Sequence, residues 1–311
     1  MAGTNARMNK YRHLRRGARL VVAVALVLSA AVTVALVRES RSEAGSARYF
    51  GSAAAIRLRH PIVDLPTGEI RAVEALARWQ HTERGLLLPA DFIPLAEATG
   101  LVQALGAAML NRVVADVARL PDGPAGPLPV HVNLSPYQVR AAGFVDVVRQ
   151  ALTSSGLEPA RLVLEITESG LLGDSETSVL TELKELGVRL AIDDFGTGYS
   201  ALGYLRRLPV DMIKIDRAFV SPLALDRRDA EIVRFVIQLA KSLDLEVVAE
   251  GVEDEAQRIR LIALGCEAGQ GFLFSRAVPL PEFRLLMNRS EAANDRTRAG
   301  STVPLFPLAA A

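Results

Sequence analysis

The sequence predicts an α/β protein: a TIM-like (β/α)8 barrel preceded by a single N-terminal transmembrane helix. Three observations lead to this prediction. An uncharged apolar run lies near the N-terminus, eight strand-like segments alternate mostly with helical ones, and a polar residue lies near the end of nearly every strand. An open doubly wound sheet is the main rival, but no glycine-rich fingerprint follows the first strand, so the barrel is preferred.

The apolar run covers residues 20–37. At helical rise it spans about 27 Å, close to the roughly 30 Å of a hydrocarbon core, which predicts a membrane helix. A cleaved signal peptide is the alternative, but the run exceeds the usual length of roughly 7 to 15 residues and no clear cleavage site follows it. Residues 1–19 then form a basic cytoplasmic N-terminus, and residues 38–54 form a polar linker.

Eight strand-like segments follow the linker. They cover residues 56–65, 72–79, 129–135, 162–168, 189–195, 212–216, 246–252 and 269–274. Helical stretches lie between most of them, so we expect parallel pairing through right-handed crossovers. The resulting domain, residues 55–288, is close to the usual size of a TIM-type barrel, roughly 250 residues.

Three helical stretches are the clearest. They are residues 91–100, in which Asp91 is the expected N-cap, residues 175–187, and residues 230–243, which carry the apolar 3.6-residue period. A glycine ends each of the first two, as is common at helix C-termini. Residues 289–311 begin with a polar stretch and are predicted to form a disordered tail.

Polar side chains near the strand ends form the candidate site. They are Glu74, Asn133, Glu165, Asp193, Asp194, Lys214, Glu250 and Gln270. In a parallel barrel all of these ends open on one face, so the scattered acids converge there. Asp193 and Asp194 are adjacent, and successive strand residues face opposite sides. Both can serve one site only if the chain leaves regular β-structure at that point.

The residue types at the strand ends indicate a metal site. Three or more carboxylates, an amide oxygen and no cysteine suit Mg²⁺ or Mn²⁺ rather than zinc. Two such ions can share a carboxylate, activate a bound water and hold a phosphate for in-line attack. Lys214 then supplies a fixed positive charge for the attacking water or the phosphoryl oxygens. The alternative is that these acids are solvated loop residues or pair with Arg or Lys. Their shared position at the ends of apolar strands disfavours this alternative.

The other polar features indicate no further site. With 36 basic against 35 acidic residues, the composition gives no reason to expect a nucleic-acid polymer as partner. Cys266 is the single cysteine, which excludes an internal disulfide and indicates a small buried residue. His60, His81 and His131 are interpreted as satisfied structural residues rather than ligands.

At these residues the sequence resembles the EAL-domain family of cyclic-di-GMP phosphodiesterases. The signature tripeptide is Glu74-Ala75-Leu76, and HVNLS, LEITES, DDFGTGYSALGYLRRLPVDMIKID, VVAEGVE and GCEAGQGFLFSR follow it in the family's order. The resemblance covers roughly residues 57–287. It implies a TIM-like barrel that hydrolyses cyclic di-GMP to the linear dinucleotide with two Mg²⁺ or Mn²⁺ ions, and it implies a homodimer. No GGDEF-type motif occurs, so there is no sign of the paired cyclase domain.

The resemblance also implies roles for individual residues. It assigns metal binding to Glu74, Asn133, Glu165, Asp193 and Asp194, with Asp193 as the bridge between the two ions. It assigns the positioning of the attacking water to Lys214, and the role of a further essential acid, as base or metal ligand, to Glu250. Contacts to the substrate fall to Arg78 and Gln270. Glu168 is expected to hold the loop that follows Asp194.

Two departures from the family pattern stand out. His60 replaces the glutamine that usually precedes the first Pro-Ile-Val, which is expected to alter substrate contacts, and the helix before the first strand is shortened. An EAL domain that binds cyclic di-GMP or a partner without turnover is the alternative function. Degenerate members typically lose the EAL glutamate, the acid pair or the lysine, and all of these are present. An unrelated metal-dependent barrel of the aldolase or enolase type explains the acids but not the ordered motifs.

The charges around the predicted membrane helix conflict with this function. Six basic residues precede residue 20, so the positive-inside rule keeps the N-terminus in the cytoplasm and exports the remainder. Cyclic di-GMP is made and used in the cytoplasm, where an exported domain would not meet it. We therefore expect a single-pass protein of the cell membrane whose catalytic domain faces the cytoplasm despite these charges. Either the helix inserts against the charge rule, or the chain derives from a longer protein whose outer sensor domain and second helix are missing.

Overall fold

The computed structural model describes residues 58–298, with the exception of residues 82, 124–125, 171–173, 197–204 and 224–226. The predicted basic N-terminus, membrane helix and linker lie outside the described residues. In the part of the chain that is described, no helix has the length and apolar character that crossing a bilayer requires.

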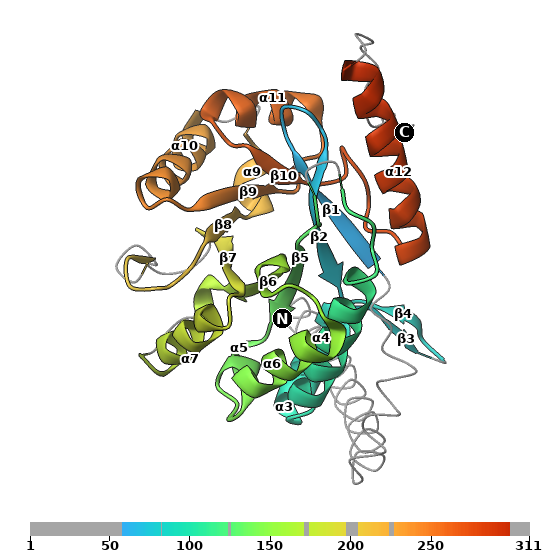
Figure 1. The fold of residues 1–311 in the computed structure, drawn as a ribbon. Helices are drawn as coiled ribbons and strands as arrows, with labels where there is room; N and C mark the ends of the chain where they lie inside the picture. The colour runs from blue at the N-terminus through green and yellow to red at the C-terminus, as the bar shows by residue number, and fades with distance from the viewer. Residues whose placement is uncertain are drawn as a thin grey trace, which may run out of the picture.

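Eight strands close into a barrel that the helices surround (Figure 1). Around the barrel they are β1 (Leu58–Asp64), β10 (Ala268–Gln270), β9 (Glu246–Glu250), β8 (Met212–Ile215), β7 (Arg189–Phe195), β6 (Leu162–Thr167), β5 (Val130–Leu134) and β2 (Ile70–Leu76). Each lies within or overlaps one of the eight predicted strand segments. The predicted TIM-like barrel is therefore confirmed.

The direction of β1 differs from the prediction of a fully parallel barrel. β1 runs antiparallel to both of its neighbours, with Leu58 opposite Leu76 of β2 and Val63 opposite Gly269 of β10. Residues 65–69, which join β1 to β2, are too few for the crossover of about a dozen residues that parallel pairing needs. The start of β1, rather than its end, therefore lies beside the C-terminal ends of the other strands.

Two predicted strands are shorter than expected. β10 ends at Gln270, and the chain turns at residues 271–274. The segment 72–79 ends at Leu76, because Trp79 belongs to a separate hairpin of β3 (Trp79–His81) and β4 (Gly85–Leu87). Trp79 packs against the helix that follows, with its ring centroid 5.9 Å from that of Phe92. The hairpin and this helix form a small apolar cluster of their own.

The helices follow the expected order. They are α3 (Pro89–Ala98), α4 (Val102–Val117), α5 (Pro136–Val139), α6 (Phe144–Ser155), α7 (Asp174–Glu185), α9 (Arg217–Val220), α10 (Arg227–Ser242), α11 (Glu255–Leu264) and α12 (Leu280–Arg298). The expected N-cap role of Asp91 is wrong. Asp91 is the third residue of α3, and its Oδ2 accepts from the backbone N–H of the actual N-cap, Leu88, at 2.9 Å.

The end of the domain also differs from the prediction. α12 continues to Arg298, so a disordered tail beginning at residue 289 is wrong for residues 289–298. This stretch contains Glu, Ala and Arg and no Gly or Pro before Gly300, a composition that favours helix despite its polarity. Residues 299–311 lie outside the described part of the chain. α12 packs beside β1 (Figure 1).

The inside of the barrel is built as two layers of side chains. We call the first the apolar layer: Ile62, Ala72, Val163, Ala191, Met212, Val248 and Ala268. Strand side chains alternate with a period of two, so the inward residue two positions along each strand forms the next layer. We call this second set the polar layer: His60, Glu74, Asn133, Glu165, Asp193, Lys214, Glu250 and Gln270.

Candidate functional site

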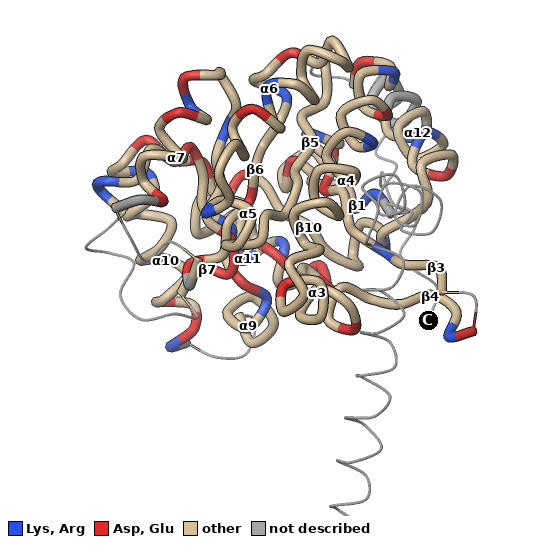
Figure 2. Tube along the Cα trace, turned by 90° about the horizontal axis from the view of Figure 1, so that it is seen from below, with Lys and Arg blue, Asp and Glu red and all other residues tan. Residues whose placement is uncertain are grey.

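The polar layer brings eight of the predicted and newly found site residues to one end of the barrel. Its members come from all eight strands. Seven lie toward the C-terminal ends of parallel strands, and His60 lies toward the start of the antiparallel β1, at the same end of the barrel. Outside the barrel, acidic and basic positions are interspersed along the helices, without a continuous basic face in the view of Figure 2.

Lys214 lies at the centre of the polar layer and is fully buried. Its Nζ is 2.5 Å from Glu250, 2.8 Å from Glu165, 3.2 Å from Asp193 and 3.9 Å from Glu74, in each case to a carboxylate oxygen. Burial alone would lower the pKa of Lys214, but the carboxylates of Glu165, Glu250, Glu74 and Asp193 together raise it well above its usual value. Lys214 is therefore held as an ammonium ion.

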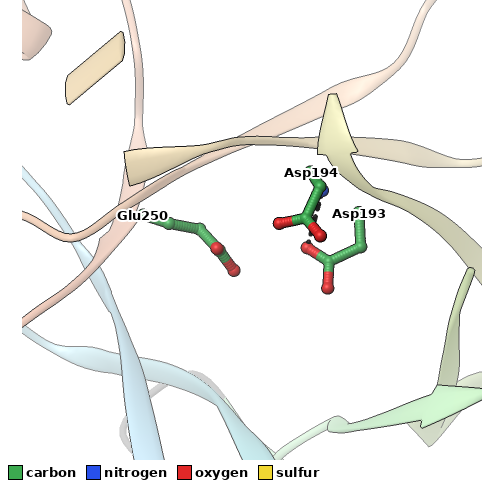
Figure 3. Close-up of side chains that lie close together, drawn as sticks. All are labelled: Asp193, Asp194 and Glu250. Carbon is green, nitrogen blue, oxygen red and sulfur yellow. Dashed lines mark hydrogen bonds between the residues drawn. The ribbon is translucent and has the colours of Figure 1, made fainter. Parts of the chain in front are cut away.

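The adjacent acids Asp193 and Asp194 reach the same site through a β-bulge. The pairing of β7 with β8 runs regularly to Ile192 and resumes at Phe195, so two residues of β7 stand opposite a single residue of β8. Asp194 adopts the left-handed conformation, with φ of 54°. Its N–H donates to Asp193 Oδ1 at 3.1 Å, which turns the two carboxylates toward each other (Figure 3). The departure from regular β-structure that the sequence required is confirmed.

Asp193, Asp194 and Glu250 form a group that fits a metal ion. Each offers a carboxylate oxygen, and these oxygens lie within 4.8 Å of one another (Figure 3). Burial and the neighbouring Asp193 raise the pKa of Asp194 to about 6, and burial raises the pKa of Glu250 to about 8. Both shifts mean that the nearby Lys214 ammonium offsets only part of the cost of burying these carboxylates in their ionised form. A hard divalent cation with oxygen ligands, such as Mg²⁺ or Mn²⁺, would supply the remaining positive charge.

Glu74 is held by two side-chain amides. Its Oε1 accepts from Asn133 Nδ2 at 2.7 Å, and its Oε2 accepts from Gln270 Nε2 at 2.6 Å. Burial favours the neutral form of Glu74, but Lys214 and the two amide donors outweigh it and lower its pKa below the usual value. The structure thus places the EAL glutamate as a carboxylate beside the metal-binding group, with Asn133 and Gln270 fixing its orientation.

Glu165 lies in the polar layer and contacts His131, which lies at the level of the apolar layer. Besides its contact with Lys214, its Oε1 is 2.7 Å from Nδ1 of His131, which occupies the inward position on β5 one step below Asn133. Burial lowers the pKa of His131 to about 3, so the imidazole is neutral, and burial raises the pKa of Glu165 well above its usual value. A single hydrogen bond therefore joins the two buried side chains. The interpretation of His131 as a satisfied core residue is confirmed, although its partner belongs to the site.

His60, which the family comparison indicated for altered substrate contacts but the strand-end pattern left out, lies in the polar layer. Its Nε2 is 3.0 Å from the carbonyl oxygen of Ser275, and its Nδ1 contacts Gln270 Nε2. Phe272 lies near the His60 ring at 6.4 Å between centroids, and the Arg276 guanidinium lies 4.2 Å above the Phe272 ring. The antiparallel β1, which pairs His60 with Glu74, is the signal that would have placed His60 in the site.

Two predicted residues lie at the border of the polar layer. Glu168 is buried in the short 3-10 turn after β6, and its Oε2 accepts from the N–H of Gly196 at 2.9 Å. It therefore holds the start of the loop that follows the acid pair, as expected. Arg78 lies just beyond β2, is partly exposed, and donates to the carbonyl of Ala77 at 2.6 Å. Its contact with substrate stays a prediction.

The fold and the polar layer define a class of protein: a TIM-like barrel with an oxygen-rich cluster that fits a divalent cation at the C-terminal ends of its parallel strands. The chain belongs to the EAL domain family, which matches residues 59–277. The site residues lie within the matched region.

Several relatives in this family are closely similar to the chain. It is 46% identical over 228 residues to the bifunctional diguanylate cyclase/cyclic di-GMP phosphodiesterase MucR of Pseudomonas aeruginosa, covering 73% of this chain and 33% of that protein. It is 46% identical over 222 residues to the cyclic di-GMP phosphodiesterase NbdA of the same species, covering 71% of this chain and 27% of that protein. The chain thus spans about a third or less of these relatives.

Solved structures agree with the sequence relatives. A structure described as the PaMucR phosphodiesterase in complex with c-di-GMP superimposes with a TM-score of 0.72 at 42% identity. The match covers 80% of this chain and 99% of that chain. The barrel described above is therefore the fold of an EAL domain whose solved relative binds cyclic di-GMP.

Proposed function

We propose that this chain hydrolyses cyclic di-GMP to the linear dinucleotide by attack of water on one phosphodiester, which lowers the level of the second messenger. The observation that carries the proposal is the polar layer itself. Four carboxylates surround the Lys214 ammonium group at the barrel mouth, and a β-bulge brings Asp194 beside Asp193. Membership of a family whose similar members are named as cyclic di-GMP phosphodiesterases supports the choice of substrate.

We propose that the site holds two divalent cations, and one group of three carboxylates supports this. Asp193, Asp194 and Glu250 would hold metal, and Glu74, Asn133 and Glu165 would complete the ligand set from the neighbouring strands. When bound, Mg²⁺ or Mn²⁺ lowers the pKa of a coordinated water and offsets the charge of the phosphate.

The protein's own groups orient the reaction. Lys214 keeps its proton, because four carboxylates raise its pKa, so it acts as a hydrogen-bond donor to the attacking water and not as a base. Glu250, with an oxygen 2.5 Å from Lys214 Nζ, is placed to accept the proton that this water loses. Arg78 and Gln270 are proposed to contact the substrate, and Glu168 to hold the loop that begins at Gly196.

Hydrolysis by the purified full chain tests this function. The chain, kept in mild detergent, is incubated with cyclic di-GMP and Mn²⁺ or Mg²⁺, and the linear product is followed by chromatography. We expect product with the wild type, loss of product with Glu74→Ala, and normal activity with the control Glu246→Ala, which removes a largely exposed acid from the far end of β9. Binding of cyclic di-GMP without hydrolysis would instead identify an inactive EAL domain that senses the nucleotide.

The location and assembly of the chain are proposed from the same function. We propose that residues 20–37 anchor it in the cell membrane, that the barrel faces the cytoplasm, and that the domain works as a homodimer. A reporter that is active only outside the cytoplasm, fused to the C-terminus, tests the orientation. A strong reporter signal would contradict it. Light scattering of the full chain in detergent tests the homodimer.

A further inference from the structure

His60 links a backbone carbonyl to the side-chain amide of Gln270. On one side, His60 Nε2 lies 3.0 Å from the carbonyl oxygen of Ser275. On the other side, its Nδ1 meets Gln270 Nε2. A carbonyl oxygen can only accept a hydrogen bond, so Nε2 must carry the hydrogen. Burial lowers the pKa of His60, which keeps the ring neutral and leaves Nδ1 as an acceptor.

The amide of Gln270 is thereby oriented from two sides. Its nitrogen donates one hydrogen to His60 Nδ1 and the other to Glu74 Oε2, at 2.6 Å. Both partners accept hydrogen bonds, so both require the nitrogen of the amide rather than its oxygen. The flipped amide would set its oxygen against two acceptors at once.

The oxygen of the same amide is left without a partner. Gln270 is 3% exposed, and its Oε1 is buried with no hydrogen-bond partner among the described residues. A buried acceptor without a partner is costly, and such a group commonly indicates a bound molecule that supplies the missing donor. The site already places Gln270 beside Glu74, so that donor belongs to whatever the barrel mouth binds.

We propose that His60 is a positioning residue: it fixes the Gln270 amide so that its nitrogen holds Glu74 and its oxygen accepts a hydrogen bond from an N–H of the bound nucleotide. This inference rests on the proposed function for the identity of the nucleotide. A histidine with Nε2 bonded to a carbonyl offers only an acceptor at Nδ1. Glutamine, the residue that the EAL domain family usually has at this position, offers either a donor or an acceptor. It would therefore orient the Gln270 amide less strictly than His60 does.

Nuclear magnetic resonance tests the positioning without any activity. In the full chain labelled with ¹⁵N-histidine and ¹⁵N-glutamine, the His60 signals, assigned by their loss in His60→Phe, should show the Nε2–H tautomer. The Gln270 side-chain amide, assigned by its loss in Gln270→Met, should exchange its hydrogens with solvent at least tenfold faster in His60→Phe. An Nδ1–H tautomer, or unchanged exchange, would overturn the proposal.

Kinetics test the contact with the nucleotide. His60→Phe keeps a ring beside Phe272 but removes the acceptor, so we expect the KM for cyclic di-GMP to rise about tenfold while kcat changes less than threefold. His60→Asn, whose amide oxygen can take the place of Nδ1, should restore KM to within threefold of wild type. The matched control His81→Phe, on the β3–β4 hairpin, should leave both constants unchanged. An unchanged KM in His60→Phe would overturn the inference.

The two tests separate this inference from the proposed function. Absence of hydrolysis by the wild type, with the Nε2–H tautomer and a protected Gln270 amide, would overturn the proposed function and support the positioning role. Hydrolysis by the wild type, with KM and amide exchange unaffected by His60→Phe, would support the function and overturn the role of His60.

Discussion

The two layers inside the barrel share strands, burial and backbone geometry but differ completely in chemistry. Val163 and Glu165 are two residues apart on β6 and are 0% and 1% exposed, and Met212 and Lys214 stand in the same relation on β8. One layer is apolar and buried, and the other is a ring of charges that water would otherwise solvate. A step of two residues along each strand therefore separates the part that stabilises the barrel from the part that we propose to be reactive.

Burial of side chains stabilises the fold in the apolar layer but is unfavourable by itself in the polar layer. Burial of Val163 or Met212 stabilises the fold by roughly 1.5 to 3 kcal/mol per side chain. Burial of the charges is unfavourable unless they pair, and even a paired set is often no better than apolar residues of the same volume. Stability alone thus explains the apolar layer but not the polar one, which is consistent with a functional reason for the charges.

The largest expected effect comes from a substitution at the centre of the polar layer. Lys214→Met removes the one ammonium among four carboxylates and leaves buried negative charge uncompensated, so we expect the free energy of unfolding to fall by about 3 to 5 kcal/mol. Hydrolysis should be lost as well. Chemical denaturation measures the first effect, with the exposed Lys241→Met on α10 as the control. A Lys214→Met protein as stable as wild type would show that the charges are not a coupled set.

The next largest effect comes from a substitution in the apolar layer, two residues from Lys214 on the same strand. Met212→Ala leaves a cavity on the same strand, and we expect the free energy of unfolding to fall by about 2 to 5 kcal/mol. In contrast to Lys214→Met, the folded fraction should keep kcat and KM within about threefold. Met212→Leu, which conserves volume, should cost less than about 1.5 kcal/mol. A tenfold loss of kcat in folded Met212→Ala would contradict the separation of the layers.

Metal binding sharpens the comparison, because only the polar layer should respond to it. At a Mn²⁺ concentration 100 times its dissociation constant, we expect thermal unfolding to show a gain of about 2.7 kcal/mol, which EDTA removes. Asp194→Asn should reduce this gain, since it removes one carboxylate of the metal-binding group. Asp244→Asn is the matched control, because Asp244 shares the positive φ of Asp194 but lies outside the site. An equal gain in both variants would contradict the proposed metal site.

The smallest effect concerns Cys266, which is buried in the apolar core outside the two layers. Burial raises the pKa of its thiol from 9.0 to about 12, so the folded state keeps a proton that the unfolded chain loses. The unfolding free energy should therefore fall as pH rises through this window, and Cys266 should account for about 1 kcal/mol of that fall between pH 9 and pH 10. Denaturation of wild type and Cys266→Ala at both pH values isolates this share. Equal losses in the two proteins would contradict the prediction.

The sequence carried enough information for the barrel and most of its polar layer, because apolar segments with a polar residue near each end repeat along the chain. It was less informative about β1, where the decisive feature is a missing crossover between Asp64 and Ile70 rather than any residue in the strand. The direction of β1 explains why the strand-end pattern left out His60: a polar residue near the start of a strand was expected at the far end of the barrel. The short strands β3 and β4 and the polar helix at the end of α12 lack the periodicity on which strand and helix predictions depend.

The reversed direction of β1 also determines where the rest of the chain is tethered. Leu58 stands opposite Leu76 at the barrel mouth, so the peptide preceding it joins the domain on the reactive side, two residues from His60. Had β1 run parallel to its neighbours, that junction would lie at the opposite mouth, with the full length of the barrel wall between it and the polar layer. A pull or twist on the upstream tether would therefore act first on β1, the strand that carries His60. The orientation of one strand gives an upstream mechanical input a short route to the chemistry.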